Sequence, residues 1–329
     1  MSNEFGVMRI VDANINRAVE GLRVMEEVAR FVLDDKAKTK QFKELRSRLR
    51  KVSIELKVIK HRDSAKDVGG KFNTKNENKR ESLLDIFAAN AKRVQEALRV
   101  LEEFLKLINT KYGKLLKDIR FAVYELEQQV SLKLLKQVKL DFDVYLVTDP
   151  MADHVKTIKK ALAVGIKMVQ IRDKGASKKQ LLTWSKIIAP LSRKHGATFI
   201  VNDFFDIAKE VGADGVHLGQ EDLKQTTLNI LRKKYGDDLI IGVSTHSLDQ
   251  AKKAIKAGAD YISCGPIFKT PSKPLGRPLG LKTLRAVIKL SHIPVVAIGG
   301  INHSNIESVR KTGCQRVAMI RGLIKKLGG

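Results

Sequence analysis

The chain has 329 residues, enough for about two domains at roughly 100–200 residues each. Apolar residues make up 43% of it and charged residues 30%, so a sizeable core and a polar surface are both expected. The sequence has no run near the roughly 18 apolar residues of a membrane span, and its first residues lack the apolar segment of a secretion signal. Two cysteines, Cys264 and Cys314, exclude a disulfide framework and a four-cysteine zinc site; we expect small core residues in a protein of the reducing cytoplasm.

Lys and Arg number 62 against 36 Asp and Glu, which gives a net charge of +26. Such an excess raises nucleic acid or an anionic surface as a partner. The excess is spread over the whole chain, however, and no aromatic residues interleave with it as a base-stacking surface requires. We therefore expect neither nucleic acid nor a membrane as a partner, and we expect the positive field to attract small phosphorylated anions. A lysine-rich composition in a heat-adapted organism is the alternative explanation.

Residues 8–139 have the periodicity of helices, with apolar side chains at three- and four-residue spacing on one face. In the first segment these positions are Ala18, Val19, Leu22, Met25, Ala29 and Val32. Further helices are predicted near 37–60, 82–108 and 112–139. Ser82 followed by Asp85 resembles an N-cap signal. The polar, glycine-containing stretch 61–80 predicts a long loop between two helix pairs, and loops of that length are often functional.

The helical half contains an internal repeat. Residues 14–27 and 90–103 match at an offset of 76 residues, with Asn, Arg, Glu, Leu, Arg, Val, Glu and Glu in common. Two copies of a helical hairpin, packed about a pseudo-twofold axis, would form a four-helix domain. We therefore predict an all-α domain over residues 1–140.

After residue 140, short apolar and β-branched runs alternate with helical stretches. The eight strand candidates are 145–148, 168–172, 198–202, 215–218, 240–244, 261–265, 294–299 and 316–320. Near-continuous apolar strands separated by helices indicate a parallel sheet covered by helices. Eight such units predict an α/β fold, a (β/α)₈ TIM barrel over residues 141–329 preceded by the helical domain. A doubly wound open sheet is the alternative.

Barrel enzymes react at the carboxyl ends of their strands, where polar groups recur in this sequence. The second strand ends with Gln170, Arg172 and Lys174, which strand alternation places on one side. Two cations and an amide at that spacing suit a multiply charged phosphate, because Arg binds it through two hydrogen bonds and Lys as a point charge. The alternative is a solvated strand end.

Two carboxylates follow neighbouring strands, Asp203 after the third and Asp222 after the fourth. Such hard ligands would share one Mg²⁺, which keeps its waters and bridges to phosphate oxygens. An Asp after a strand is also often a helix N-cap, so that interpretation stays open. We expect His217 to face the barrel interior as a packing or hydrogen-bonding residue rather than as a general base.

The remaining strand ends supply hydroxyl groups, a lysine and glycines. Ser244 ends the fifth strand, and Thr270, Ser272 and Lys273 cluster on the loop after the sixth. That loop would close over a phosphate, unless it is an ordinary basic loop. The loops after the seventh and eighth strands form the usual phosphate site of a barrel, through glycine amides and a helix N-terminus. The rim therefore predicts two anion sites.

Residues 144–324 resemble thiamine phosphate synthase over nearly their whole length and in the family's order. The matching pieces begin with Tyr145-Leu-Val-Thr-Asp149, Gln170-x-Arg-x-Lys174 and Val201-Asn-Asp203. They continue with Gly212-Ala-Asp-Gly-Val-His-Leu-Gly-Gln220 and Asp222, Gly242-x-Ser244, Gly265-Pro-Ile-Phe268 and Val296-Ala-Ile-Gly-Gly-Ile301. The family joins hydroxymethylpyrimidine diphosphate to thiazole phosphate and releases diphosphate, so the resemblance implies a transferase of thiamine biosynthesis.

The resemblance also implies a role for each matching residue. Gln170, Arg172, Lys174 and Asn202 would hold the diphosphate, assisted by Ser244 and Lys273, with Arg172, Lys174 and Lys273 as the catalytic cations. Asp203 and Asp222 would bind Mg²⁺. Thr270, Ser272, Gly300 and the amides near Ile320 and Arg321 would hold the thiazole phosphate. Ser272 and Arg321 depart from the family, which commonly has Thr and a small Ser at these places.

The implied chemistry is a dissociative transfer. The bond between the pyrimidine methylene and its oxygen breaks first, the ring stabilises the cation, and the thiazole nitrogen then adds to it. Positioning and electrostatic stabilisation would carry the rate, so no strong general base is required. We identify no nucleophile–base pair among these residues, as that mechanism predicts.

Residues 8–108 resemble the N-terminal extension of long-form thiamine phosphate synthases, as in cyanobacteria. The matching pieces lie at 9–14, 20–27, 62–63, 67–69 and 93–103. That extension is associated with an alternative hydroxymethylpyrimidine phosphate kinase, which would use ATP and make the diphosphate that the barrel consumes. The sequence has no Walker-type glycine loop, so the kinase expectation rests on the resemblance.

The helical half offers a candidate site of its own. Its candidate residues are Asn14, Arg17, Arg62, Asp63, Asn90 and Arg93. Two Asn–Arg pairs facing a shared cleft would bind a phosphorylated ligand, and the loop with Arg62 and Asp63 is a candidate phosphate loop. The alternatives are that the repeat only preserves bundle packing and that the loop is a solvated linker. Glu20, Arg23 and Glu27 lie farther round the helix, at spacings that suit ion pairs within it.

The sequence leaves two other interpretations open. In one, the helical half is a dimerisation or docking module beside the same barrel enzyme, which would form a homo-oligomer. In the other, the chain is a regulator that only binds thiazole phosphate or thiamine phosphate. The presence of Arg172, Lys174, Asp203 and Asp222 argues against a regulator.

Overall fold

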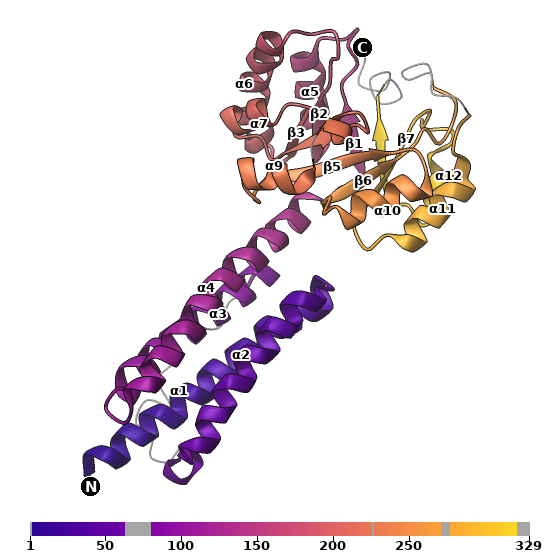
Figure 1. The fold of residues 1–329 in the computed structure, drawn as a ribbon. Helices are drawn as coiled ribbons and strands as arrows, with labels where there is room; N and C mark the ends of the chain where they lie inside the picture. The colour runs from indigo at the N-terminus through magenta and orange to yellow at the C-terminus, as the bar shows by residue number, and fades with distance from the viewer. Residues whose placement is uncertain (1, 63–79, 226, 271–276, 321–329) are drawn as a thin grey trace. The chain divides into compact units, whose positions relative to one another are not determined.

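The computed structural model describes residues 2–62, 80–225, 227–270 and 277–320. The chain divides into two compact units, Met1–Leu135 and Lys136–Gly329. The first unit is helical and the second is a barrel of strands and helices (Figure 1), and each is described by itself. None of the helices in the described ranges is long and apolar enough to cross a membrane.

The helical unit is built from four long helices and two short irregular turns in its described part. They are α1 (Ser2–Glu27), the π-helical η1 (Val28–Val32), α2 (Lys36–Glu55), the 3₁₀ turn η2 (Val58–His61), α3 (Leu83–Leu105) and α4 (Thr110–Lys139). The predicted helices are confirmed, but α1 begins at Ser2 instead of near residue 8, because its first turns are partly exposed and show little apolar periodicity. The predicted cap of α3 is confirmed as well: the Ser82 hydroxyl accepts the Asp85 backbone N–H at 3.1 Å.

Helices α1 and α3 cross at close range in the core of this unit. A Cβ atom added at Gly21 would lie 2.6 Å from Val94 Cγ2 and 3.2 Å from the Asn90 carbonyl oxygen. Glycine at this position is therefore what allows the two helices to approach. The largest buried side chains of the unit include Leu22, Met25, Phe42, Phe87, Leu98 and Leu101.

Each copy of the repeat contributes one buried carboxylate–guanidinium pair. Glu26 of α1 binds Arg46 of α2 at 2.6 Å, and Glu102 of α3 binds Arg120 of α4 at 2.9 Å. The two glutamates are equivalent at the 76-residue offset, so the repeat extends to the pairing between neighbouring helices. Each glutamate also binds an arginine of its own helix, Arg23 for Glu26 at 3.3 Å and Arg99 for Glu102 at 3.2 Å, so each carboxylate joins two cations.

The second unit is a closed barrel of eight parallel strands. The strands are β1 (Val144–Val147), β2 (Met168–Ile171), β3 (Thr198–Asn202), β4 (Gly215–Leu218), β5 (Ile240–Thr245), β6 (Tyr261–Cys264), β7 (Val295–Ile298) and β8 (Arg316–Met319). Each strand pairs with the next along the chain, and β8 pairs with β1. The predicted barrel is confirmed and the open sheet is excluded; the predicted strand ends are right to within one residue.

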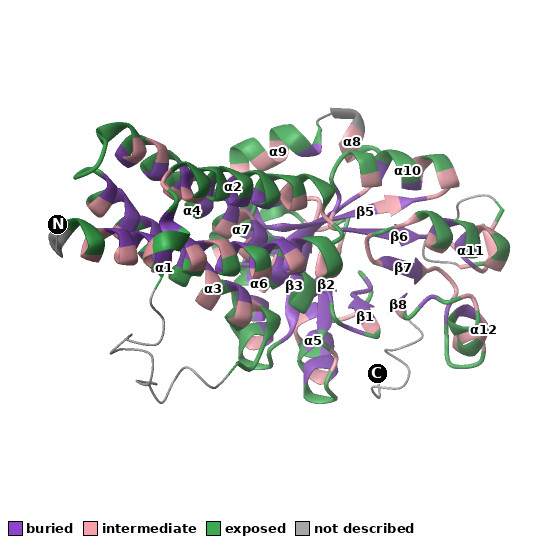
Figure 2. Ribbon diagram, turned by 90° about the horizontal axis from the view of Figure 1, so that it is seen from below, coloured by how far each residue is buried: buried purple, intermediate pink, exposed green. Residues whose placement is uncertain are grey.

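The connecting helices cover the outside of the barrel (Figure 1). They are α5 (His154–Ala163), α6 (Lys178–Lys194), α7 (Phe205–Val211), α8 (Asp222–Gln225), α9 (Leu228–Tyr235), α10 (Leu248–Lys256), α11 (Gly280–Leu290) and α12 (Ile306–Arg310). Figure 2 shows buried strands and helices with exposed outer faces, as expected when helices cover a parallel barrel. Cys264 and Cys314 are both buried, as predicted.

Side chains alternate between two cores along each barrel strand. The core between the strands and the helices includes Leu146, Val169 and Phe199. The barrel interior is filled by Leu140, Phe142, Tyr145, Val147, Met168, Ile200, Ile240, Tyr261, Val296 and Ala318. On β2, Met168 points into the barrel, and Gln170, two residues later, points the same way and lines the pocket. Alternation thus carries polar side chains toward the mouth of the barrel.

Two aspartates brace the end of the barrel where the strands begin. Asp214, just before β4, accepts a backbone N–H of β3 at 2.8 Å, and Asp260, just before β6, accepts one of β5 at 2.7 Å. Each also binds a lysine from the last turn of α4: Asp214 binds Lys139 at 2.5 Å and Asp260 binds Lys136 at 3.2 Å. These carboxylates satisfy backbone donors and cations together, as expected of a stabilising role at this end of a barrel.

We expect Gly21→Ala to destabilise the protein, and Gly6→Ala in the same helix to leave it equally or more stable. A methyl group at residue 21 would overlap Val94, and such overpacking typically costs about 1–3 kcal/mol. At residue 6 the methyl group would meet nothing within 4 Å and would favour the helix by about 0.5–1 kcal/mol. Urea unfolding followed by circular dichroism measures both changes. Equal stabilities would show that the helices are not closely packed at Gly21.

Candidate active site

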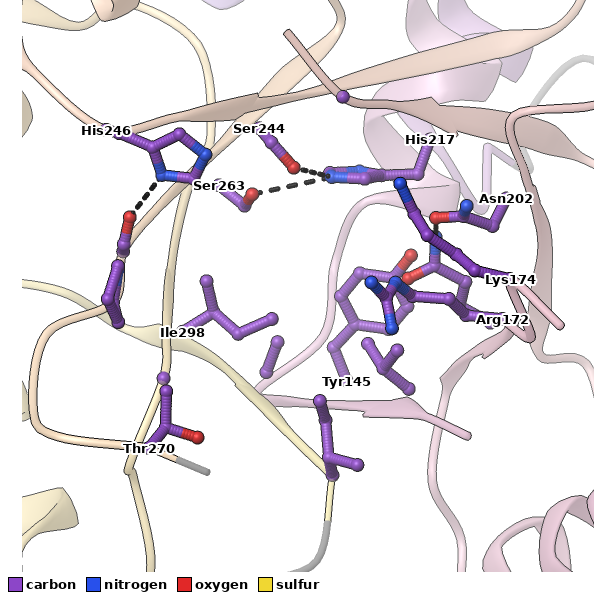
Figure 3. Close-up of a pocket in the computed structure, with 18 of the residues that line it drawn as sticks. Tyr145, Arg172, Lys174, Asn202, His217, Ser244, His246, Ser263, Thr270 and Ile298 are labelled. Atoms are coloured by element: carbon purple, nitrogen blue, oxygen red, sulfur yellow. Dashed lines mark hydrogen bonds between the residues drawn. The ribbon is translucent and has the colours of Figure 1, made fainter. Parts of the chain in front are cut away.

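A pocket opens at the carboxyl ends of the barrel strands (Figure 3). It is lined by Tyr145, Val147, Gln170, Arg172, Lys174, Asn202, Asp203, His217, Gly219, Ser244, His246, Ser263, Gly265, Pro266, Thr270, Ile298, Gly299, Ala318 and Ile320. Cationic, amide, hydroxyl and imidazole groups share this pocket with an apolar wall that includes Val147, Ile298 and Ala318. The combination suits a ligand with a charged part and a flat, uncharged part.

Most of the predicted barrel residues come together here. Gln170, Arg172, Lys174, Asn202, Asp203, Ser244, Thr270 and Ile320 line the pocket. Asp222 shares a hydrogen bond with Asp203, and Gly300 directly follows the lining residue Gly299. Ser272, Lys273 and Arg321 lie outside the described residues, so their roles stay predictions.

Neighbouring strands hold the amide and the guanidinium in place. Gln170 Nε2 donates to Asn202 Oδ1 at 3.1 Å, which ties β2 to β3 at their ends. The hydroxyl of Thr148 accepts the backbone N–H of Arg172 at 3.0 Å and lies 3.3 Å from its carbonyl oxygen. Figure 3 shows the Arg172 and Lys174 side chains extended toward the centre of the pocket. The backbone from which the guanidinium extends is therefore fixed before any ligand binds.

Asp173 shapes the loop between the two cations. Its carboxylate accepts the backbone N–H groups of Gly175 at 2.9 Å and Ala176 at 3.2 Å, and it lies 3.2 Å from His154 Nε2. Burial opposes ionisation of Asp173, but the Gly175 N–H and the His154 contact outweigh it and lower its pKa. An ionised carboxylate only accepts hydrogen bonds, so His154 donates from Nε2. The first residue of α5 thereby fixes the loop that carries Lys174.

Asp203 and Asp222 lie against each other at the mouth. Burial, repulsion by the Asp222 carboxylate and the hydrogen bond between the two raise the pKa of Asp203 to about 6, although Lys174 and Arg172 oppose the shift. Asp203 also has a φ of 64°, in the left-handed region that Asp tolerates better than most residues. Its N–H donates to the His217 carbonyl oxygen at 2.9 Å, which holds this conformation. Such strain is typical of functional sites.

The donor set of this carboxylate pair fits Mg²⁺. Two facing carboxylates supply hard oxygen ligands, and a cation between them would relieve the repulsion that raises the Asp203 pKa. In the part of the chain that the structure describes, no group of three or more His, Cys, Asp or Glu side chains is placed to hold a metal. Water and substrate oxygens would complete the shell, as Mg²⁺ prefers. Neither aspartate acts as the helix N-cap that the sequence left open: Phe204 precedes α7, and Asp222 is the first residue of α8, where it accepts the preceding Gly219 N–H at 2.7 Å.

A chain of hydrogen bonds crosses the barrel interior to the pocket. The Tyr145 and Tyr261 hydroxyl oxygens lie 3.1 Å apart, and the Tyr261 oxygen lies 2.8 Å from His217 Nδ1. On the other side of the ring, His217 Nε2 lies 2.9 Å from Ser244 Oγ and 3.4 Å from Ser263 Oγ. The interior hydrogen-bonding role predicted for His217 is confirmed. His217 and Ser244 lie on the paired strands β4 and β5, whose register brings the imidazole and the hydroxyl together. The expectation of no nucleophile–base pair stays a prediction.

Sequence reasoning missed Tyr145, His246, Ser263 and Ile298 as pocket residues. For Tyr145 and Ser263 a signal existed, since each is a polar group at an inward position of a strand. His246 directly follows β5, and its Nδ1 donates to the Gly265 carbonyl oxygen at 2.6 Å. That contact joins two loops far apart in the sequence, so no local pattern contains it.

In the helical unit, the predicted site residues differ in their contacts and in their exposure. Asn14 and Asn90 each donate from Nδ2 to the carbonyl oxygen four residues earlier in the same helix, at 2.9 and 2.8 Å. Arg17 and Arg93 are exposed. These hydrogen bonds agree with the packing interpretation of the repeat, and ligand binding by the two asparagines stays a prediction. Asp63 lies outside the described residues.

Arg62 has a partner that sequence reasoning missed. Its guanidinium makes two hydrogen bonds to the buried carboxylate of Asp12, each at 2.8 Å. Asn16, one turn farther along α1, donates to the same carboxylate at 3.2 Å. Among the pairs expected within α1, the contact between Arg23 and Glu27 is present. The Asp12–Arg62 pair therefore joins η2 to α1 through an organised polar contact.

The fold and the pocket together define a class of protein. A (β/α)₈ barrel whose mouth gathers two cations, two facing carboxylates and several hydroxyl groups is an enzyme site for phosphorylated substrates. Its family follows from comparison with known proteins. The family model described as thiamine monophosphate synthase matches residues 144–323, and that of the ThiD2 family matches residues 9–129.

Individual proteins of this kind match most of the chain. The thiamine-phosphate synthase of Gloeobacter violaceus is 40% identical, over 97% of this chain and 92% of that protein, and the one from Synechocystis sp. is 39% identical over the same shares. Among solved structures, thiamine phosphate pyrophosphorylase from Pyrococcus furiosus is 33% identical with a TM-score of 0.50, over 58% of this chain and 100% of that one. The chain belongs to the thiamine-phosphate synthase family.

The carboxylate pair should cost stability when no metal ion is bound. Asp203 ionises above about pH 3.8 in the unfolded chain but only above about pH 6 in the folded one, so folding is penalised at neutral pH. We expect Asp203→Asn, which keeps a residue that tolerates positive φ, to stabilise the metal-free protein at pH 7.5 by about 1–2 kcal/mol after allowance for solvent screening. Below pH 4 the difference should largely vanish. Urea unfolding in EDTA at both pH values measures it, and an equal gain at both would rule out repulsion as its cause.

Proposed function

We propose that the barrel joins hydroxymethylpyrimidine diphosphate to thiazole phosphate, giving thiamine phosphate and diphosphate. The observation that carries this proposal is one pocket that holds Arg172 and Lys174 beside the Asp203–Asp222 pair, in a member of the thiamine-phosphate synthase family. A diphosphate suits this arrangement because its many oxygens accept hydrogen bonds from cations and also bind a divalent ion. The apolar wall beside these groups suits the rings of the two substrates.

The proposed reaction exchanges a C–O bond for a C–N bond. The bond between the pyrimidine methylene carbon and the diphosphate oxygen breaks, and the departing diphosphate keeps the electron pair. The ring stabilises the resulting cation, and the thiazole nitrogen donates its lone pair to form the new bond. Charge stabilisation and positioning are the main demands of such a reaction, which the pocket's residues supply without a strong base.

The side chains of the pocket divide this work. Arg172 and Lys174 hold the diphosphate oxygens and stabilise the charge that grows on them as the bond breaks. The tied amides of Gln170 and Asn202 orient the same substrate. Mg²⁺, held by Asp203 and Asp222, would neutralise further charge on the leaving group. Ser244, Thr270, Ser272, Lys273, Gly300, Ile320 and Arg321 keep the roles implied by the family resemblance.

Lys174→Ala should lower turnover at least about 10²-fold, the scale of losing one preorganised electrostatic contact. Lys178→Ala is the matched control, because that lysine starts α6, pairs with Asp206 and does not line the pocket. The initial rate of diphosphate release with both substrates and Mg²⁺ measures the effect. Near-normal rates in both Lys174→Ala and Asp203→Ala would refute the assignment of the site.

We infer that the helical half is a kinase that uses ATP to convert hydroxymethylpyrimidine phosphate into the diphosphate. The match of residues 9–129 to the ThiD2 family supports this inference. Arg62, fixed by Asp12, and the exposed Arg17 and Arg93 are the groups that would contact phosphate. The competing proposal is a dimerisation or docking module, which the repeated buried ion pairs of the bundle also suit.

The kinase should be measurable in the full chain when its product is not consumed. We expect Lys174→Ala protein, given ATP, Mg²⁺ and hydroxymethylpyrimidine phosphate, to accumulate the diphosphate, which chromatography and mass spectrometry detect. Adding Arg62→Ala should lower that rate at least about tenfold by removing a phosphate contact. A folded protein that forms no diphosphate would exclude the kinase; a dimer by gel filtration in that case would favour docking.

A further inference from the structure

Ser244 and His217 meet in the pocket like the serine–imidazole pair of a nucleophilic enzyme. His217 Nε2 lies 2.9 Å from Ser244 Oγ (Figure 3). Whether such a pair activates the serine depends on which ring nitrogen carries the hydrogen. In a Ser–His–Asp triad a carboxylate accepts a hydrogen bond from Nδ1, which leaves Nε2 as the base. Here the group at Nδ1 is the hydroxyl of Tyr261, at 2.8 Å.

Matching donors with acceptors shows in which direction the hydrogen bonds through Tyr145, Tyr261 and His217 run. Tyr145 and Tyr261 are buried, and burial raises the pKa of both hydroxyl groups, so each keeps its hydrogen. Within the described residues, the hydrogen-bond partner of the Tyr145 hydroxyl is Tyr261. If Tyr145 donates to Tyr261, then Tyr261 donates to His217 Nδ1 and both tyrosine hydrogens have an acceptor. The opposite direction leaves the Tyr145 hydrogen without one, which is unfavourable in the interior.

The contact between Tyr261 and His217 depends on a glycine. His217 is on β4 and Tyr261 on β6, and the register places Gly242 of the intervening β5 beside both residues. A Cβ atom at Gly242 would lie 2.1 Å from Tyr261 Cζ and 2.4 Å from its hydroxyl oxygen. The tyrosine ring therefore occupies the space above Gly242 and reaches across one strand to the imidazole.

We propose that Tyr145 and Tyr261 set the tautomer of His217 so that Nε2 carries the hydrogen and donates it to Ser244. The imidazole then has no lone pair facing the serine and cannot take its proton. Ser244 instead directs its hydroxyl hydrogen into the pocket, as a donor to an anionic oxygen of the ligand. The two tyrosines and His217 are positioning residues that act through Ser244.

The tautomer assignment does not rest on the proposed function; only the identity of the ligand does. If the ligand is the diphosphate substrate, the arrangement affects the course of the reaction. A dissociative transfer creates a carbon cation next to the diphosphate. A serine activated by a basic imidazole would attack that cation: its Oγ would bond to the methylene carbon while His217 took the proton. With the hydrogen already on Nε2, that proton has no acceptor on His217, so Ser244 stabilises the departing anion and leaves the cation for the thiazole nitrogen.

The test reads the tautomer directly. In full-length protein labelled with ¹⁵N-histidine, nitrogen NMR shows which ring nitrogen carries the hydrogen. The chain has 7 histidines, and the spectrum of His217→Asn identifies the signal of His217 by its loss. We expect Nε2 to be protonated and Nδ1 bare at pH 7.5. A His217 ring protonated at Nδ1 overturns the proposal, whether or not the protein shows synthase activity.

Two tyrosine variants separate positioning from simple loss of packing. Tyr145→Phe removes one buried hydroxyl but leaves Tyr261 as the donor to Nδ1, so the Nε2–H tautomer should persist. Tyr261→Phe removes the donor itself and should shift the ring toward the Nδ1–H form. It should also weaken binding of inorganic diphosphate with Mg²⁺ about tenfold more than Tyr145→Phe does, by titration calorimetry.

An unchanged tautomer and equal affinities in these two variants would overturn the tyrosine part of the proposal. If Tyr261→Phe does not fold, the wild-type spectrum still decides. Failure of the wild type to bind diphosphate, together with an Nε2–H ring, would count against the proposed function and leave the tautomer assignment standing.

Discussion

Repulsion between two carboxylates at the barrel mouth is the constraint around which the active site is arranged. Asp203 and Asp222 face each other in a partly buried place, and Lys174 and Arg172 offset only part of the cost. Such a site is unfavourable while empty, and under the proposed function a divalent cation and a polyanion would relieve the repulsion. The cost of holding the two carboxylates together would then be offset in the complex with substrate, as preorganised electrostatic catalysis requires.

The barrel could be predicted from the sequence because its signals are local. Each strand is a short buried run followed by a helix, and alternation along β2 accounts for the inward direction of Gln170. Arg172 and Lys174 also line the pocket as predicted, but they follow the end of β2, where the Asp173 hydrogen bonds shape the loop. The aspartates were also found, since they follow strands that end at one rim. These inferences need only the direction of the chain and the period of a strand.

The remainder of the site depends on register and on contacts between distant loops. The meeting of Tyr261 with His217 requires that Gly242 lie between them, which a sequence cannot show until the pairing of three strands is known. The left-handed backbone of Asp203 and the loop contact of His246 are likewise tertiary. In the helical half, the repeat predicted the bundle, and the ligand-binding role of the asparagines stays a prediction, because a shared position in two copies can also mean shared packing.

Some ion pairs of the helical unit occur in both copies of the repeat, and one occurs in a single copy. The buried glutamate–arginine pairs occur in both copies, so they belong to the architecture of the bundle. The pair between Asp12 and Arg62 has no such counterpart, since the position 76 residues after Asp12 is Ala88. A polar contact that occurs in only one copy of the repeat is not part of the packing that the two copies share. The asymmetry distinguishes the Asp12–Arg62 pair from the pairs that build the bundle, and the phosphate contact proposed for Arg62 stays a prediction.

In the barrel, aspartate serves opposite purposes at the two ends of the strands. Asp214 and Asp260 precede strands, where each meets a backbone N–H and a lysine and so stabilises the fold. Asp203 and Asp222 follow strands, where each meets the other, and their mutual repulsion is available to a ligand. The side chain is the same in all four cases; the parallel direction of the strands determines its neighbours. Each strand begins at the end braced by Asp214 and Asp260 and ends at the pocket, so position before or after a strand separates the aspartates that stabilise the fold from those that we propose as metal ligands.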